Sequence, residues 1–348
     1  MTAPSPFTPA VAVEEVPAQV RMVQLLAGFQ VSQALYVVAE LDIAAALEAG
    51  PRTVPDLAAA VGADPAALRR LLRSLAGLGL FRSDGQDGFA VTPLGATLAS
   101  DAPDSVRDVA LTWMETHYAP FGELLGTVRT GEPAATRFYG QPYFDWLAGD
   151  GAQVARFTGA MAALTTGVKA GAVQGYTLPG GQTVVDVGGA DGAMLLVLLG
   201  ADPDPGRRGV VFDRPHVVPA ASARLADSPL AGRVDVVGGD FFEAVPAGDV
   251  HLLSLVLHDW ADEPARRLLR TVAAAGRPGS RLVALELVMP SDDSPHLARM
   301  IDLTMLGMLT GRERTAAEHE ELLASAGFRL DAIRATPTPM SIIEATRT

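Results

Sequence analysis

The sequence predicts an α/β protein in which a helical N-terminal domain precedes a larger domain built on a mostly parallel β-sheet. Two observations support this prediction. From Gln182 onward, short runs rich in Val and Leu alternate with helical patterns, which is typical of βαβ units. The first of these runs leads into a glycine-rich turn, "DVGGADG", which is followed by the apolar helical stretch "AMLLVLL".

The composition is that of a folded protein and excludes several functions. The 348 residues, 49% of them hydrophobic, suffice for two domains with a substantial core. Acidic residues outnumber basic ones, 40 to 27, which disfavours binding to nucleic acids and to anionic membranes. The absence of cysteine excludes disulfides and thiol catalysis. We find neither an apolar run of membrane-spanning length nor a signal-peptide pattern, and we therefore expect a cytoplasmic protein.

The N-terminal third predicts a dimerisation domain. Residues 1–18 are rich in Pro and Ala, and we expect them to be mobile. Residues 20–47 show a helical pattern that is apolar on nearly every side, so the helix needs burial on more than one face. A small domain can hardly supply that burial, and we expect a subunit interface in a homodimer.

The stretch from residue 53 to residue 100 resembles a winged helix. We expect Thr53 and Asp64 to be helix N-caps, and two Asp-Gly pairs in "LFRSDGQDGFAVT" predict a hairpin. A winged helix raises a rival function, a DNA-binding regulator, in which Arg69, Arg70 and Arg73 would face phosphates. Residues 1–100 carry six basic and nine acidic residues, however, and phosphate contacts need a basic excess.

The glycine-rich turn predicts a ligand site. It fails the dinucleotide fingerprint that would start at Gly188, because Ala190 and Ala193 stand where glycine is required. Asp186 in the preceding strand suits a ligand that carries a cationic group. Its alternative reading is an ordinary turn residue.

Two further acids are expected at the same crevice. Asp213 ends the next strand, where an acid can accept hydrogen bonds from a ribose diol. Asp240 ends the third strand, with Phe241 and Phe242 ready to pack against a purine. Each acid alone could be a helix cap, but three at successive strand ends face one crevice, where open α/β sheets bind ligands.

Six stretches together resemble one family. "VVDVGGADGA", "FDRPHVV", "GGDFFEAVPAGD", "LLSLVLHDWAD", "LVALELVMP" and "GRERTAAEHEELLASAGF" follow the order and spacing of the S-adenosylmethionine-dependent O-methyltransferases of the plant caffeate/hydroxyindole type. The chain is most similar to their bacterial relatives that tailor aromatic natural products, over about residues 20–345. The resemblance implies S-adenosylmethionine as cofactor and a homodimer.

The resemblance also implies a domain plan and cofactor contacts. A Rossmann-like methyltransferase domain with a seven-stranded mixed sheet would span 176–348, after a winged-helix-like dimerisation domain at 19–103 and a helical, pocket-lining linker at 104–175. Asp191 departs from the family's glycine loop. The implied cofactor contacts are Asp186, Gly188, Gly189, Asp213, Asp240, Phe241 and, near the adenine, Ser254.

His258 in "LSLVLHDWAD" is the predicted general base. A phenol has a pKa near 10, and a neutral imidazole with a pKa near 6.5 can take its proton as the oxygen attacks the sulfonium methyl. We expect His258 to close the fourth strand beside the cofactor crevice. In the resembling family this histidine has that role, and the flanking acids correspond to Glu286 and Glu313. Asp259 is expected to position the histidine or to contact the substrate.

The predicted acceptor is a small aromatic molecule, because residues 104–175 are rich in aromatic side chains that can wall an apolar pocket. All of these side chains could instead be simple core. The sequence has no metal-binding spacing and no tight acid/His cluster, so no metal is expected. The same fold could also catalyse N- or C-methylation, hydroxylation or decarboxylation. The expected pocket residues are Trp113, His117, Phe144, Phe157, Met161, Met300, Leu303 and Met308.

Overall fold

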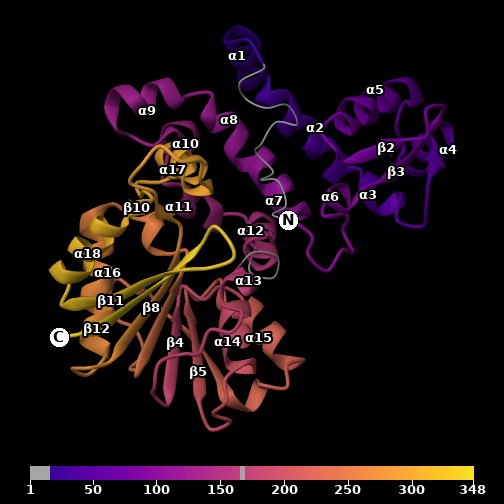
Figure 1. Ribbon diagram of the computed structural model, residues 1–348. Helices are drawn as coiled ribbons and strands as arrows, with labels where there is room; N and C mark the ends of the chain where they lie inside the picture. The colour runs from indigo at the N-terminus through magenta and orange to yellow at the C-terminus, as the bar shows by residue number, and fades with distance from the viewer. Residues whose placement is uncertain (1–15, 165–168) are drawn as a thin grey trace. The chain divides into compact units, whose positions relative to one another are not determined.

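The computed structural model describes residues 16–164 and 169–348, and the chain divides into two compact units. The first unit ends at Ala102 and the second spans Pro103–Thr348 (Figure 1). Of the N-terminal segment expected to be mobile, residues 1–15 lie outside the described part of the chain.

The first unit packs short helices against a three-stranded antiparallel sheet of order β1-β3-β2. The predicted hairpin is present, and Thr53 and Asp64 accept hydrogen bonds at the starts of α4 and α5 as N-caps. One short helix follows the hairpin. The elements are α1 (Ala18–Leu26), α2 (Gly28–Glu40), α3 (Ile43–Ala46), β1 (Arg52–Thr53), α4 (Val54–Val61), α5 (Pro65–Ala76), β2 (Phe81–Ser83), β3 (Gly88–Val91) and α6 (Pro93–Ala96).

The helical pattern over residues 20–47 is divided among α1, α2 and α3, and α1 buries no residue within the unit. In the described part of the chain, no single helix is long and apolar enough to cross a membrane; α1 and α2, bent by 41° relative to each other, reach the required length and composition only as a pair. The apolar side chains exposed along these two helices are Val20, Met22, Val23, Leu25, Leu26 and Phe29.

The second unit begins with short helices that lead into the sheet domain. A π-helical turn, Trp113–His117, interrupts the first of them. π-helical turns occur mostly as single insertions at functional sites. The helices are α7 (Arg107–Thr112), α8 (Tyr118–Phe121), α9 (Leu124–Thr130), α10 (Ala134–Tyr139), α11 (Tyr143–Ala148), α12 (Gly151–Leu164) and α13 (Ala170–Ala172).

The sheet has seven strands in the order β11-β12-β8-β7-β4-β5-β6, which confirms the predicted mixed sheet. Strands β8, β7, β4, β5 and β6 run parallel, and the C-terminal hairpin joins the sheet at the β8 edge, as the sequence predicted. In this hairpin β12 is antiparallel both to β8 and to β11. The strands are β4 (Thr183–Val187), β5 (Arg208–Asp213), β6 (Val234–Gly238), β7 (Val250–Ser254), β8 (Arg281–Glu286), β11 (Phe328–Ala335) and β12 (Ser341–Arg347).

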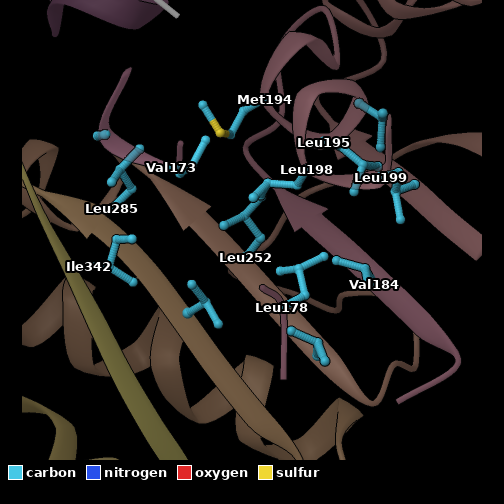
Figure 2. Packing of buried hydrophobic residues seen from close by; sticks show 14 of the residues in the cluster. Val173, Leu178, Val184, Met194, Leu195, Leu198, Leu199, Leu252, Leu285 and Ile342 are labelled. Carbon is cyan, nitrogen blue, oxygen red and sulfur yellow. The ribbon is translucent and has the colours of Figure 1, made fainter. Parts of the chain in front are cut away.

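Helices cover both faces of the sheet (Figure 1). Side chains alternate between the faces, so Val184 packs with the α14 side and Val185 with the α16 side. Figure 2 shows the first of these cores, where Leu195 and Leu198 contribute to the buried cluster. Each such side chain stabilises the fold by about 1.5–3 kcal/mol. The helices are α14 (Ala193–Gly200), α15 (Val218–Ala226), α16 (Asp262–Ala275), α17 (Leu297–Met308) and α18 (Ala316–Ser325).

The strand order places a ligand crevice. From β4 the chain proceeds outward to β5 and β6, whereas β7 pairs with the opposite side of β4 and continues to β8. The connections therefore leave in opposite directions between β4 and β7, and open α/β sheets bind ligands at such a switch point, beyond the carboxyl ends of the strands. Directly after β8, the short strand β9 (Val288–Met289) pairs in parallel with β10 (Arg314–Thr315).

Candidate active site

A cavity of about 330 Å³ lies in the second unit. We call it the central cavity. Its walls come from the glycine loop after β4, the turn after β7, the π-helical turn, and helices α11, α12 and α17. Both strands that flank the switch point therefore open into it, as expected for a ligand site in this fold.

The glycine loop brings backbone close to the cavity. Gly188 has φ +74°, and a Cβ there would lie 2.9 Å from Val256 Cγ2, so glycine is required on two grounds. Ala190 has φ +48°, a left-handed conformation that is unfavourable for alanine. Its N–H donates to Asp213 Oδ2 at 2.8 Å. Gly188, Gly189 and Ala190 all line the cavity.

Asp186 is a buried acid without a partner. Its side chain lines the central cavity, and neither carboxylate oxygen has a hydrogen-bond partner among the described residues. Burial raises the pKa of Asp186 to about 7, against an opposing effect of Lys169. Burying an unpaired carboxylate is costly, so this group is suited to a ligand that brings a positive charge.

Of the other two acids expected at the crevice, only Asp213 lines the cavity. Its oxygens accept the N–H groups of Ala190 and Arg214, which fix the carboxylate in place. Asp240 is not in the cavity wall: it follows β6 by two residues and accepts the N–H of Phe242 at 2.7 Å. The expectation of a third acid at the crevice therefore stays a prediction for Asp240, one oxygen of which accepts a backbone N–H in a turn.

One side of the cavity is aromatic. Phe241 lines the cavity, and its ring lies 5.9 Å from that of Trp260, edge to face. The indole N–H of Trp260 is buried and has no hydrogen-bond partner among the described residues. The hydroxyl of Ser254 is likewise buried, with no hydrogen-bond partner among the described residues. Two buried donors in the wall of one cavity are available to a ligand. Trp260 was missed from the sequence, although it belongs to the "HDW" motif.

His258 lies beyond its strand. β7 ends at Ser254, and His258 occupies a single 3-10 turn, Leu257–Asp259, so the expectation that it closes the strand is wrong. Leu255 between them has φ +55°, a conformation that turns the chain out of the sheet direction. The imidazole is buried and lines the central cavity.

Both ring nitrogens of His258 face carboxylates. Nδ1 lies 2.7 Å from Glu313 Oε1, and Nε2 lies 3.4 Å from Asp259 Oδ1. Burial lowers the pKa of His258, but Asp259, Glu313 and Glu286 together outweigh it and raise the pKa to about 10. The sequence-based expectation of a neutral ring with a pKa near 6.5 is therefore wrong for the ligand-free protein, because the fold gathers three acids around the ring.

Glu286 hydrogen-bonds the backbone of the turn before His258 and not its imidazole ring. Its Oε1 accepts the N–H groups of Val256 and Leu257, at 3.2 and 2.9 Å. Burial raises the pKa of Glu286 to about 7, with an opposing effect of His258. The fold also creates a cluster that the sequence did not reveal: His258, Glu286 and Glu313 offer ligand atoms within 4.8 Å of one another, close enough to hold a metal ion. The absence of a metal requirement stays a prediction.

The cavity wall opposite the sheet contains six of the eight expected pocket residues. Met300 and Leu303 are not among them: they are 54% and 41% exposed. The predicted register was wrong by one residue at two positions. The α17 positions that line the cavity, at the spacing of one helix face, are Leu297, Ile301, Thr304, Met305 and Met308. The expected residues in the wall are Trp113, His117, Phe144, Phe157, Met161 and Met308.

His117 ends the π-helical turn and is neutral. Its Nδ1 lies 2.7 Å from the Thr116 hydroxyl, which in turn lies 3.0 Å from the Tyr143 hydroxyl. Burial lowers the pKa of His117 to about 4. The cavity therefore has two histidines of different character, a neutral one in the helical wall and one held among acids beside the sheet.

Asp191, the departure in the glycine loop, is an ion-pair residue here. Arg224 Nε donates to its Oδ2 at 2.7 Å, and Oδ1 accepts the N–H of Ala193. The carboxylate therefore pins the start of α14 to α15, although the residue also borders the cavity.

Together, the switch-point cavity, an unpaired acid near the end of β4, an acid at the end of the next strand and a histidine among acids define an S-adenosylmethionine-dependent methyltransferase. Comparison with known sequences specifies the class. A family model described as the O-methyltransferase domain matches residues 121–329, and one described as the O-methyltransferase dimerisation domain matches residues 23–101. The chain belongs to this O-methyltransferase family.

Characterised relatives cover nearly the whole chain. The phenazine O-methyltransferase of Lysobacter antibioticus is 39% identical over 331 residues, 95% of this chain and 96% of that protein. The structure of human N-acetylserotonin methyltransferase in complex with S-adenosylmethionine matches with a TM-score of 0.87 at 27% identity, over 97% of this chain and 99% of that one.

A third match is a structure with a second small molecule bound in addition to S-adenosylmethionine. An O-methyltransferase from neocarzinostatin biosynthesis, in complex with S-adenosylmethionine and 2-hydroxy-5-methyl naphthoic acid, has a TM-score of 0.76 at 34% identity, over 91% of this chain and 96% of that one. The predictions of an enzyme, of its fold and of its cofactor are confirmed: the chain is an S-adenosylmethionine-dependent O-methyltransferase of secondary metabolism.

Proposed function

We propose that this enzyme methylates a hydroxyl group of a small aromatic molecule, with His258 receiving the hydroxyl proton. The observation that supports this proposal is the placement of His258 in the cavity wall with Nδ1 bonded to Glu313. A ring whose Nδ1–H donates to a carboxylate can accept a proton only at Nε2. The acceptor oxygen would then lie between Nε2 and the sulfonium methyl group.

The reaction is a direct displacement. The acceptor oxygen forms a bond to the methyl carbon as the bond from that carbon to sulfur breaks, which leaves neutral S-adenosylhomocysteine. Nε2 of His258 takes the proton, and Glu313 stabilises the imidazolium that results. Such a base contributes about 10²- to 10⁴-fold to the rate. Alignment of oxygen, carbon and sulfur contributes up to about 7–11 kcal/mol.

Acceptance of a proton requires a neutral ring, whereas the ligand-free ring has a raised pKa. Binding of the cofactor would lower this pKa. A sulfonium cation in the cavity disfavours a second positive charge beside it and so lowers the pKa of His258. Asp259, 3.4 Å from Nε2, is placed to carry the displaced proton away. Binding of the cofactor would thereby prepare the base.

The proposed cofactor contacts divide by chemistry. Asp186 would bind the ammonium of the methionine moiety and Asp213 the ribose diol, with the backbone at Gly188 and Gly189 packed against the cofactor. Phe241, Ser254 and Trp260 would surround the adenine. A contact of Asp240 with the cofactor is implied only by the family resemblance, because Asp240 does not line the cavity.

The proposed acceptor site is the wall made by the π-helical turn, α11, α12 and α17. Phe144 and Phe157 meet edge to face, with ring centroids 5.9 Å apart, and present apolar surface to a planar ligand. His117 is one of the polar groups in this wall. Because it is neutral, it would hydrogen-bond a substituent of the acceptor instead of adding charge. Trp113, Met161 and Met308 would complete the enclosure.

We propose a homodimer located in the cytoplasm. Exposure of the apolar side chains of α1 and α2 to water is unfavourable, and a second chain can bury them. The matched dimerisation domain includes these helices from residue 23 onward. Sedimentation of the purified protein at micromolar concentration should give twice the mass of one chain. Fractionation of the producing cells tests the location. Binding of nucleic acid is not expected at a net charge of −13.

The function is tested by incubating the enzyme with S-adenosylmethionine and hydroxylated aromatics, with mass spectrometry of the products. We expect His258→Ala to lose about 10²- to 10⁴-fold in turnover and to keep its affinity for S-adenosylhomocysteine. Undiminished turnover of this variant across pH 6 to 9 would rule out the base. Conversion of the aromatic molecule without release of S-adenosylhomocysteine would instead support non-methylating chemistry.

N-methylation is a second candidate because one relative, 36% identical, is named 8-amino-8-demethylriboflavin N,N-dimethyltransferase. A neutral aromatic amine needs a weaker base than a phenol does. Matched phenol and aniline pairs on one aromatic scaffold would separate the two reactions, and O-methylation should be the more sensitive to loss of His258.

A further inference from the structure

Lys169 is a buried cation whose role remains unassigned. It is the only lysine of the sequence, it precedes α13, and it is 6% exposed. Its side chain lines the central cavity. No hydrogen bond, and no ion pair within 4.0 Å, joins its ammonium to another residue in the described part of the chain. Burial of a charged group without a direct partner is unfavourable, and a ligand can supply the partner.

Its position relative to the cavity acids is informative. Burial lowers the pKa of Lys169, and four carboxylates oppose this, with Asp186 the strongest and Asp259 the weakest. Lys169 is therefore coupled more closely to Asp186, near the end of β4, than to Asp259 beside the catalytic histidine. Asp186 also lacks a direct partner. The wall of one cavity thus contains a buried anion and a buried cation that do not form an ion pair with each other.

This arrangement is complementary to a zwitterion. The methionine moiety of S-adenosylmethionine carries an ammonium and a carboxylate on the same carbon atom, so their receptors must be neighbours. We propose that Lys169 binds this carboxylate while Asp186 binds the ammonium. The proposal rests on the cofactor contact proposed above for Asp186, and it adds a residue from outside the glycine loop to the cofactor site.

The remaining cations of the wall are placed elsewhere. Arg214 directly follows Asp213, the acid assigned to the ribose, and its guanidinium lies 3.7 Å from Asp145. His216 is two residues further along the same segment. His258 is held by Glu313 on the acceptor side. Lys169 is left as the cation of the cavity wall at the amino-acid end.

Ligands that differ only in the carboxylate provide the test. Decarboxylated S-adenosylmethionine keeps the sulfonium and the ammonium but has no carboxylate. With isothermal titration calorimetry, we expect Lys169→Met to weaken binding of S-adenosylmethionine and S-adenosylhomocysteine about 10- to 100-fold, the range of a charge-assisted hydrogen bond. The Kd of decarboxylated S-adenosylmethionine should change less than about twofold. Lys169→Arg should restore part of the loss.

Controls separate this role from others. Arg214→Met removes another cation of the wall and should not discriminate between the carboxylated and decarboxylated ligands. Equal weakening of both ligands by Lys169→Met, or none, would overturn the proposal. An unchanged Kd for S-adenosylhomocysteine with a raised KM for an acidic acceptor would assign Lys169 to the substrate instead. Because binding is measured without turnover, failure of the proposed methyl transfer would not mimic any of these results.

The single lysine allows a second, independent measurement on the unaltered protein. Reductive methylation with formaldehyde and a borane modifies Lys169 and the N-terminal amine only, and the latter serves as internal reference. Peptide mass spectrometry should show that S-adenosylhomocysteine slows labelling of Lys169 at least tenfold relative to the reference. 5′-Methylthioadenosine, which lacks the amino-acid moiety, should protect much less. Equal protection by both ligands would contradict the carboxylate contact.

Discussion

At the scale of single residues, the site is governed by His258 and the acids around it. Glu313 and Asp259 approach opposite ring nitrogens, and Glu286 fixes the backbone of the same turn. The ring is therefore charged in the empty site, because removing its proton would leave carboxylates facing each other in a buried place. An enzyme that uses a neutral imidazole as its base must therefore lower the pKa of His258 when its ligands bind.

A measurable consequence is proton release on cofactor binding. At pH 8, below the raised pKa of about 10, the ring of the ligand-free enzyme is charged, and the sulfonium should displace up to one proton. S-Adenosylhomocysteine is a neutral thioether and should displace fewer. Titration calorimetry in buffers of different ionisation enthalpy counts these protons. His258→Asn should abolish the difference between the two ligands, and equal proton release by both in the native enzyme would disprove the mechanism.

Ala190 is a second residue whose local conformation predicts a measurable effect. Its φ of +48° is costly for alanine and neutral for glycine. Ala190→Gly should stabilise the ligand-free protein by up to about 1 kcal/mol, measured by urea unfolding. The same substitution at Ala274, an exposed position inside α16, should destabilise by about 1 kcal/mol. Loss of stability at both positions would show that the loop is not strained.

At the scale of elements, the short pair β9 and β10 holds the catalytic turn. Arg314 in β10 is 1% exposed, and it donates to the carbonyl groups of Leu257 and Trp260, both at 2.8 Å. It also pairs with Asp262 at the start of α16. One guanidinium thereby ties the turn that carries His258 to a strand and a helix, which is possible because its donors form a rigid fork.

Arg314 is therefore expected to be a positioning residue. Arg314→Lys keeps the charge but cannot span both carbonyls, so kcat should fall about tenfold while the Kd of S-adenosylhomocysteine is unchanged. Arg312→Lys is the matched control, since Arg312 hydrogen-bonds the side chains of Asp262 and Glu318 and is partly exposed. A parallel loss of ligand binding and thermal stability, without a selective effect on kcat, would indicate a purely structural role.

The element scale also shows where sequence reasoning succeeds. The alternation of strands and helices, the C-terminal hairpin and the caps at Thr53 and Asp64 are local patterns, and the structure contains them. The register of α17 is different. Met300 and Leu303 are as apolar as Ile301 and Met305, so hydrophobicity alone cannot tell the cavity face from the exposed face. Only the packing of the whole helix decides between them.

At the scale of the whole molecule, the properties that escaped the sequence are those that the fold creates at long range. The raised pKa of His258 depends on Glu286 and Glu313, which follow it by 28 and 55 residues. Lys169 reaches the cavity from a segment that carries no recognisable motif, and its burial beside Asp186 could not be read from its neighbours in the chain. Sequence motifs predicted which strand ends contribute to the site, whereas the protonation states of the residues there depend on charges from distant parts of the chain.

These charges link stability to pH. The pKa of His258 rises from 6.5 to about 10 on folding, so its contribution to stability is fully present below pH 6.5 and is lost as the pH rises through 10. Burial raises the pKa of Asp186 and Glu286 to about 7, and the folded state therefore holds more protons than the unfolded state between about pH 4 and 7. All three groups make stability fall as the pH rises.

Lys169 acts in the opposite direction at higher pH, because burial lowers its pKa. The contribution of His258 is therefore isolated by comparing the native enzyme with His258→Asn in urea unfolding between pH 7.5 and pH 9. The slope of stability against pH should be more negative in the native enzyme than in the variant, because only the native enzyme loses the stabilising imidazolium over this range. The slope is the readout, because it is independent of any constant loss of stability that the substitution causes. An unchanged slope in the variant would mean that the ring is neutral in the folded protein and that the acids around it do not hold a proton there.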